Sequence, residues 1–370
     1  MNSEKISGRQ LWFILFLMRS SIIISSLPVL TTADAGRDAW ISGILVLAFS
    51  LLFIALLNSL DLRFPGQTVI EYSQKILGTV LGKIISFIIL WIFLQTSLIE
   101  IRLYGELIIT GFMPQTPIIF IIGGMVLTSL ICIYSGIEVL GRTADFIFFI
   151  FIIMLLGIIL IPLGDFDYRN LQPVLARGIQ PVIRGSLVPV ALISQTWVLG
   201  ILNSITISSK KFKYWIPLSS IATSLIILII IVVIVIGVIG AHEGSRATFP
   251  ILTLMRSVIL TRFLQRTELL IVFGWGMGLF ISVSTFLYCG ARGLAQWFNL
   301  HDYNPLLGPM SVLWTYMSYF SFDSMFVFYK FISPEIYAPY GLGILFLPLV
   351  LLWLGFIFRK IMKLPLNSEQ

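Results

Sequence analysis

Charged residues are scarce in this chain of 370 residues. Only 11% of its residues are Asp, Glu, Lys or Arg, whereas 58% are hydrophobic, and the mean hydropathy is +1.00. A soluble globular protein carries about 25% charged residues, because the surface that faces water must be polar. The apolar stretches are long and continuous rather than alternating every second residue, which favours helices over a β-barrel. We therefore expect an all-α integral membrane protein.

Cysteine and histidine are nearly absent as well. Cys132 and Cys289 lie in apolar runs and allow at most one disulfide, so we interpret them as small packing residues. His242 and His301 are far apart in the sequence, which argues against a histidine-rich metal cluster. The sequence contains neither a Walker-type phosphate-binding loop nor a set of nucleophile, base and orienting group. We therefore predict no enzymatic activity, no cofactor and no metal, and the sequence argues against an ATP-driven pump within this chain.

Long apolar runs are abundant. A helix of about 20 apolar residues crosses about 30 Å of hydrocarbon. Ten runs satisfy this requirement, at residues 11–30, 40–60, 81–101, 117–134, 146–163, 186–202, 215–239, 269–291, 309–328 and 340–358. We interpret the first run as a retained helix and not a signal peptide, because it is long and contains Arg19. We expect residues 1–370 to form one polytopic domain with two five-span repeats, at about 8–165 and about 182–360.

The basic residues predict the orientation of the spans. The formal net charge is +7, which we attribute to cytoplasmic Lys and Arg and not to a nucleic-acid partner. If the N-terminus is cytoplasmic, only Lys330 of the nine lysines falls outside. We therefore expect both termini in the cytoplasm. Residues 250–257, in a long outer connection, show helical periodicity and predict a short amphipathic helix on the surface.

Polar residues interrupt the first and sixth spans, which open the two halves of the chain. Ser20, Ser21 and Ser25 precede Pro28 in the first, and Ser194, Gln195 and Thr196 follow Pro189 in the sixth. Helix breaks at matching positions of two halves indicate an inverted-repeat transporter, in which half-helix N-termini face an anionic group. The alternative is that the serines bond their own helices and the prolines only bend them.

Several ionisable residues lie in or near the spans. Arg102 and Glu106 are four residues apart, so a structural ion pair is expected, whereas Glu100 lies deeper and is a functional candidate unless it is hydrated. Three residues between the fourth and fifth spans are expected to form an ion network, with gating as the alternative role: Glu138, Arg142 and Asp145. On the third and eighth spans, three polar residues are expected to face a central cavity: Gln95, Ser284 and Tyr288.

Five short segments in a fixed order carry a family resemblance. They are residues 6–11, 36–40, 63–71, 116–117 and 136–142. In this order, with ten spans, the chain resembles the B subunit of bacterial endospore germinant receptors, the GerAB/GerKB type of spore germination protein. This type is related to the amino acid–polyamine–organocation permeases.

The resemblance implies a LeuT-like core of two inverted five-helix repeats in the spore inner membrane, with helices 1 and 6 interrupted. It also implies partners, an A-type membrane subunit and a C-type lipoprotein, and a role for this subunit in recognising the germinant. Relatives often carry glycine at the break in the first helix, whereas this chain has Arg19, Ser20 and Ser21 there.

We therefore expect a germinant-sensing subunit that binds a small molecule, plausibly an amino acid, in a permease-like pocket. The expected contacts are Ser20, Ser21, Ser25, Gln95, Ser194, Gln195, Thr196, Ser284 and Tyr288, with backbone N–H groups at the breaks holding a carboxylate. The alternatives are an active secondary amino-acid transporter and a purely structural subunit.

Overall fold

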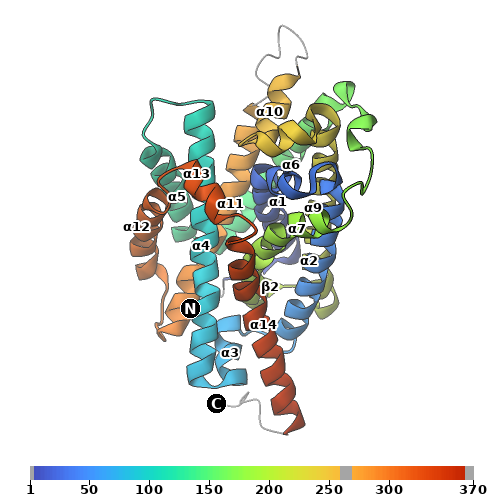
Figure 1. Ribbon diagram of the computed structural model, residues 1–370. Helices are drawn as coiled ribbons and strands as arrows, with labels where there is room; N and C mark the ends of the chain where they lie inside the picture. Colours follow the sequence, from blue (N-terminus) through green and yellow to red (C-terminus); the bar gives the residue numbers. More distant parts are fainter. Residues whose placement is uncertain (1–3, 259–268, 363–370) are drawn as a thin grey trace.

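The computed structural model describes residues 4–258 and 269–362, with the side chains of residues 22–27 excepted (Figure 1). Helices account for most of this part of the chain. A two-stranded parallel sheet joins β1 (Ile6–Ser7) to β2 (Thr206–Ile207) and is a small departure from the predicted all-α class.

The first half begins with α1 (Gly8–Ala35), whose N-terminus is held by a capping box between Ser7 and Gln10. The short helix η1 (Gly36–Asp38) leads into α2 (Ala39–Asp61). A second capping box, between Thr68 and Glu71, starts the amphipathic helix α3 (Val69–Leu77). The half continues with α4 (Thr79–Gly111), α5 (Ile118–Tyr134), α6 (Ile137–Leu160), η2 (Ile161–Asp165) and η3 (Tyr168–Leu171).

The second half begins with a span in three pieces, α7 (Gln180–Ala191), η4 (Leu192–Val198) and α8 (Leu199–Ile205). The pieces confirm the interruption predicted in the sixth span. Pro189 removes one backbone donor near the end of α7, and the chain then winds as a 3₁₀ helix. After β2 come α9 (Lys210–Arg246), α10 (Pro250–Ser257), α11 (Leu269–Trp297), α12 (Asn304–Phe320), α13 (Met325–Phe331) and α14 (Tyr337–Ile361).

The interruption predicted in the first span is wrong, because α1 runs as one helix from Gly8 to Ala35. Residues 19–28 contain no glycine, and a helix in apolar surroundings keeps its backbone hydrogen bonds because no water replaces them. Pro28 lies inside this helix, and the Thr32 hydroxyl donates to the Pro28 carbonyl at 2.5 Å.

Seven helical stretches of the described residues are long and apolar enough to cross a membrane: Pro28–Asp61, Thr79–Gly111, Ile137–Asp165, Gln180–Ile205, Lys210–Arg246, Leu269–Trp297 and Tyr337–Ile361. A shorter apolar helix spans Ile118–Tyr134. The span predicted at 309–328 runs past the end of α12 at Phe320, because Ser324 caps a new helix, α13. The number of membrane crossings, ten, stays a prediction.

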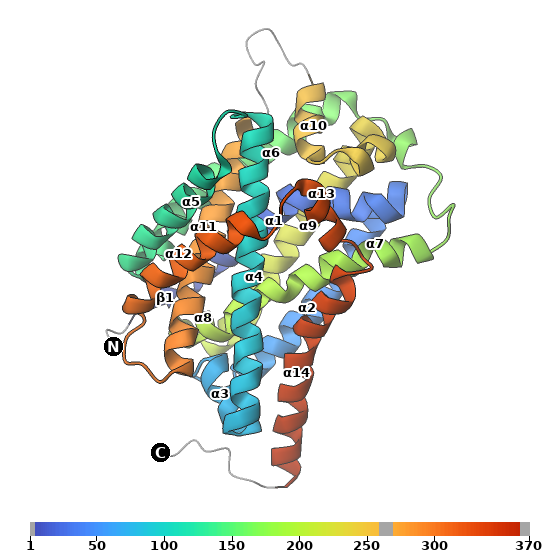
Figure 2. The ribbon, with the colours of Figure 1, turned by 60° about the vertical axis from the view of Figure 1, so that its left-hand side comes forward.

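The helices form a bundle with α1 in its middle, packed against α6, α7, α9 and α11 (Figure 2). One end of the bundle carries β1, β2, α3 and the last turns of α14, and we call this end the terminal face. The opposite end carries α10, and we call it the distal face. The predicted amphipathic helix is confirmed as α10, with Ile251, Leu254 and Met255 buried.

Candidate functional site

Polar side chains gather in the apolar middle of the bundle, on four elements that pack against one another: α1, α4, η4 and α11. Each of these side chains is at most 3% exposed. The backbones approach closely there, since a Cβ added to Gly278 of α11 would lie 3.2 Å from the Cβ of Ser21 on α1. We call this set the central polar cluster, and it consists of Arg19, Ser20, Ser21, Thr96, Glu100, Ser194, Gln195, Thr196, Ser282 and Ser284.

Arg19 brings a positive charge into the cluster. Its Nη1 donates to the backbone carbonyl of Leu192 at 3.2 Å, at the point where α7 gives way to η4. Its Nε and Nη2 have no hydrogen-bond partner among the described residues. A guanidinium with unused donors in an apolar interior is unfavourable unless an anionic or polar group faces it. The carbonyl at the helix interruption therefore satisfies only part of the hydrogen-bonding capacity of the Arg19 guanidinium.

Glu100 brings an ionisable carboxyl group to the same region. Both of its oxygens are buried and make no hydrogen bond within 3.5 Å among the described residues, with the Ser282 hydroxyl of α11 beside the group. No N–O distance between Arg19 and Glu100 falls within 4.0 Å, the limit for an ion pair. A guanidinium and a carboxyl group thus face the interior without pairing directly.

The neutral members of the cluster add further unused groups. Five hydroxyls and one amide have no hydrogen-bond partner among the described residues, namely those of Ser21, Thr96, Ser194, Ser282, Ser284 and Gln195. In folded proteins about 90% or more of buried polar groups are hydrogen-bonded, so such a concentration requires an explanation. Because these groups surround an interrupted helix and two unpaired ionisable groups, they can contact a small polar ligand.

Two of the residues predicted as contacts, Gln95 and Tyr288, lie outside the cluster. Gln95 donates from Nε2 to the Tyr337 hydroxyl at 3.1 Å and accepts from the Tyr340 hydroxyl, so α14 engages its amide. Tyr288 lies near the terminal face, where its hydroxyl contacts Glu4. Thr196 lies in the cluster, but its hydroxyl donates to its own helix at 2.7 Å. The side chain of Ser25 lies outside the described part of the structure.

The five other charged residues that were singled out from the sequence divide into two groups. Arg102 and Glu106 form the buried i,i+4 pair expected of them, with donor–acceptor distances of 3.0 and 2.7 Å. The predicted network of Glu138, Arg142 and Asp145 is absent, since these three residues do not pair with one another in the described chain. Glu138 instead accepts from the backbone of Lys5, Asp145 pairs with Arg9, and Arg142 is exposed.

Four members of the cluster were not among the predicted contacts, although one of them, Glu100, was a functional candidate. Thr96 and Glu100 lie one helical turn apart on the same face of a helix, so the position of Glu100 could have been used to predict Thr96 as a site residue. Arg19 is an ionisable residue inside an apolar run, which by default indicates function. Ser282 had no comparable signal, because its place in the cluster depends on how α11 packs against α4.

Comparison with known families shows which family the chain belongs to. The model of the spore permease family, described as spore germination protein, matches residues 5–326. The chain belongs to this family. It is 29% identical over 321 residues to spore germination protein KB of Bacillus subtilis, with 84% of each chain covered. It is 28% identical to spore germination protein YndE of the same organism, with 84% of this chain and 86% of the relative covered.

Solved structures show the fold of this spore permease. MhsT, solved in complex with L-phenylalanine, superposes with a TM-score of 0.68 at 14% identity, covering 95% of this chain and 99% of MhsT. Mhp1, a nucleobase-cation-symport-1 family transporter solved with bromovinylhydantoin, gives a TM-score of 0.52 at 14% identity, covering 99% and 95%. The predicted LeuT-like transporter fold is thereby confirmed, and the chain is a multi-pass membrane protein.

Proposed function

We propose that this spore permease is the germinant-sensing subunit of an endospore germinant receptor, and that it binds a zwitterionic amino acid at the central polar cluster. The observation that carries the proposal is the pair of buried ionisable groups of opposite type, Arg19 and Glu100, which do not pair with each other. A zwitterion supplies one group of each sign on a single small molecule. It can therefore satisfy both charges at once, which neither a sugar nor a simple ion can do.

The roles of the residues follow from their chemistry. The planar guanidinium of Arg19 suits a carboxylate, which it can bind through two donors. The carboxylate of Glu100 suits an ammonium group. The hydroxyls of Ser20, Ser21, Ser194 and Ser284 and the amide of Gln195 then line the ligand, and together with Thr196 they fix its orientation. In MhsT, which shares the fold, the bound molecule is an amino acid.

Sensing requires that the bound ligand favour one arrangement of the protein over another. We place the protein in the spore inner membrane with both termini in the cytoplasm, in a complex with an A-type membrane subunit and a C-type lipoprotein. Family membership supports this placement. A ligand that joins α1, α4 and η4 changes how these elements pack, and the partner subunits would respond to that change.

Spore germination with matched small molecules tests the site. Spores carrying the wild-type gene and spores lacking it are exposed to L-alanine, L-valine and L-phenylalanine, and to L-alaninamide and propionate, each of which lacks one of the two charges. A response that depends on the gene is expected from at least one amino acid and from neither analogue. If the spores without the gene respond normally to the whole panel, the proposed function is wrong.

Single substitutions then test the two charges. In spores that respond, Arg19→Gln and Glu100→Gln are each expected to raise the half-maximal amino-acid concentration by about tenfold or more, because each removes one charge-assisted contact. Ser86→Ala is the matched control, since Ser86 is a buried polar residue of α4 outside the cluster. An unchanged dose response at normal protein abundance would assign the ligand to another site.

A further inference from the structure

The first described residues of the chain cross the terminal face as an extended strap. We define the N-terminal strap as residues 4–7. Ile6 is fully buried and pairs with Thr206, and Ser7 pairs with Ile207, in parallel register. The strap is thus joined to the chain that leaves α8, and it continues directly into α1 at Gly8. The strap therefore continues into α1, which carries part of the central polar cluster. It also pairs with the segment after α8, and α8 directly follows η4 of the cluster.

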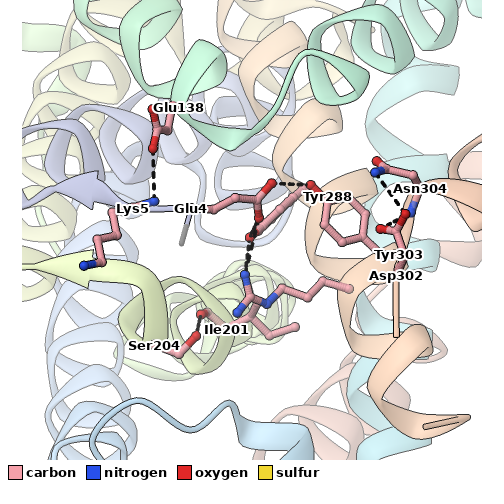
Figure 3. A network of polar contacts seen from close by, with 10 residues as sticks. Glu4, Lys5, Glu138, Ile201, Ser204, Tyr288, Asp302, Tyr303 and Asn304 are labelled. Atoms are coloured by element: carbon pink, nitrogen blue, oxygen red, sulfur yellow. Dashed lines mark hydrogen bonds and ion pairs between the residues drawn. The ribbon is translucent and has the colours of Figure 1, made fainter. Parts of the chain in front are cut away.

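Glu4 ties the strap to the other side of the bundle (Figure 3). The Tyr303 hydroxyl donates to its Oε1 at 2.6 Å, and the Tyr288 hydroxyl donates to its Oε2 at 3.1 Å. Arg292 Nη1 lies 3.6 Å from Oε2 and donates to the Tyr288 hydroxyl at 2.6 Å. The backbone N–H of Lys5 also donates to Glu138 of α6 at 3.4 Å. One carboxylate therefore holds two tyrosines and an arginine around the strap.

The contacts of Glu4 stabilise the arrangement in which the strap lies against the bundle. Hydrogen bonds and ion pairs that involve a charged group are stronger than neutral ones, and partial burial increases the difference. The Glu4 side chain is 22% exposed and that of Arg292 is 17% exposed. Burial and the hydrogen bond to Glu4 raise the pKa of the Tyr303 hydroxyl, so this group remains protonated and able to donate.

The strap lies on the side of the central polar cluster that faces the terminal end of the bundle. Tyr288 is fully buried and lies four residues, about one helical turn, beyond Ser284 of the cluster on α11. Glu4 also lines a cavity of about 590 Å³, together with Lys5, Arg292, His301 and Tyr303. Tyr288 does not line this cavity. Glu4 thus contacts the buried Tyr288 on one side and lines the cavity on the other.

We propose that the N-terminal strap is a latch that closes the central site toward the terminal face. The strap joins α1 and α8 on one side to α6 and α11 on the other, so these pairs cannot separate at this end while the Glu4 contacts persist. Opening the site toward the terminal face requires the carboxylate to leave Tyr288, Arg292 and Tyr303. The identity of the ligand at the central site does not enter this proposal.

Cysteine accessibility in the full-length protein tests the latch without any ligand. Cys132 and Cys289 are replaced by alanine, and Ser284→Cys serves as the reporter of access to the central site. Membrane vesicles of both orientations are treated with a charged, membrane-impermeant methanethiosulfonate. Labelling of Lys210→Cys, an exposed position at the start of α9 near the terminal face, shows which vesicles present that face to the reagent.

In those vesicles, Glu4→Gln and Tyr303→Phe are each expected to raise the labelling rate of the reporter by about tenfold, because each weakens the charge-assisted network. Asp302→Asn is the matched control, since Asp302 lines the same cavity but its described hydrogen bonds go only to Asn304. A rate unchanged in both latch variants, or raised equally by Asp302→Asn, overturns the proposal and makes the strap a purely structural clip.

Discussion

At the scale of single residues, α4 places two glutamates in different electrostatic situations. Glu106 accepts two hydrogen bonds from Arg102, whose Nη1 also donates to the carbonyl of Tyr319 at 2.7 Å. Glu100 is equally buried but has no such partner among the described residues. A spacing of six residues turns the two side chains to different faces of the helix. Arg102 therefore joins α4 to α12 while Glu106 neutralises its charge, whereas Glu100 faces the proposed ligand site.

Breaking the Arg102–Glu106 pair should destabilise the fold. Glu106→Leu leaves a buried guanidinium without its anion, and such changes lower the free energy of unfolding by about 3–5 kcal/mol. Thermal unfolding of the purified protein in detergent measures the effect as a lower Tm. The double variant Arg102→Met with Glu106→Leu is expected to recover most of the loss, because no charge remains unpaired. A single variant as stable as the wild type would show that the pair contributes nothing.

The sequence was informative about residues whose partners are close along the chain. The i,i+4 spacing correctly predicted the contact between Arg102 and Glu106. The same reasoning failed for Glu138 and Asp145, whose partners Lys5 and Arg9 lie 133 and 136 residues away. Helix periodicity carries no information about which distant segment approaches a helix end.

At the scale of elements, the corner between α3 and α4 depends on one glycine. A Cβ at Gly82 would lie 2.4 Å from the Cα of Gln74, so α3 packs directly on the backbone of α4. The contact is backbone to backbone, and a side-chain rotation cannot relieve it. Replacing this glycine must move one helix away from the other.

Gly82→Ala is therefore expected to lower the free energy of unfolding by about 3 kcal/mol, the upper range for overpacking a tight contact. Gly124→Ala is the control, because Gly124 is an exposed helical glycine whose added Cβ would meet nothing within 4 Å. The control is expected to be neutral or stabilising by up to about 1 kcal/mol. Equal Tm values for the two variants in detergent would argue against a close α3–α4 contact.

Several elements could be predicted from local patterns. Apolar length indicated the long helices, and amphipathic periodicity indicated α10. Pro189 with its polar neighbours indicated the break in the sixth span. The same type of pattern misled in α1, because Pro28 and the serines are compatible with a continuous helix. The pairing of β1 with β2 joins segments about 200 residues apart and left no local signal.

At the scale of the whole molecule, the basic residues predict the side on which each face lies. Lys210 and Lys211 belong to the terminal end of α9, whereas α10 marks the distal face. Single cysteines at Lys210 and at Thr253, an exposed residue of α10, should therefore be labelled from opposite sides of the membrane. In intact cells, an impermeant maleimide is expected to reach Thr253→Cys and to miss Lys210→Cys. The reverse result would invert the predicted topology and leave the fold unchanged.

The fold is that of transporters, so ligand flux is the measurement that separates a sensor from a carrier. If the N-terminal strap keeps the central site closed toward the terminal face, the wild-type chain should bind an amino acid without releasing it on that side. Liposomes containing the purified chain alone, given labelled L-alanine or the amino acid found active on spores, are then expected to show binding close to the amount of protein and no sustained uptake.

The latch variant Glu4→Gln should convert that binding into slow, saturable flux, because it weakens the contacts that close one end of the path. Asp302→Asn should behave as the wild type. Rapid uptake by the wild-type chain would instead favour a secondary transporter, with the strap opening in every cycle. Binding without flux in all three proteins would mean that another barrier, at the level of the central polar cluster, holds the ligand.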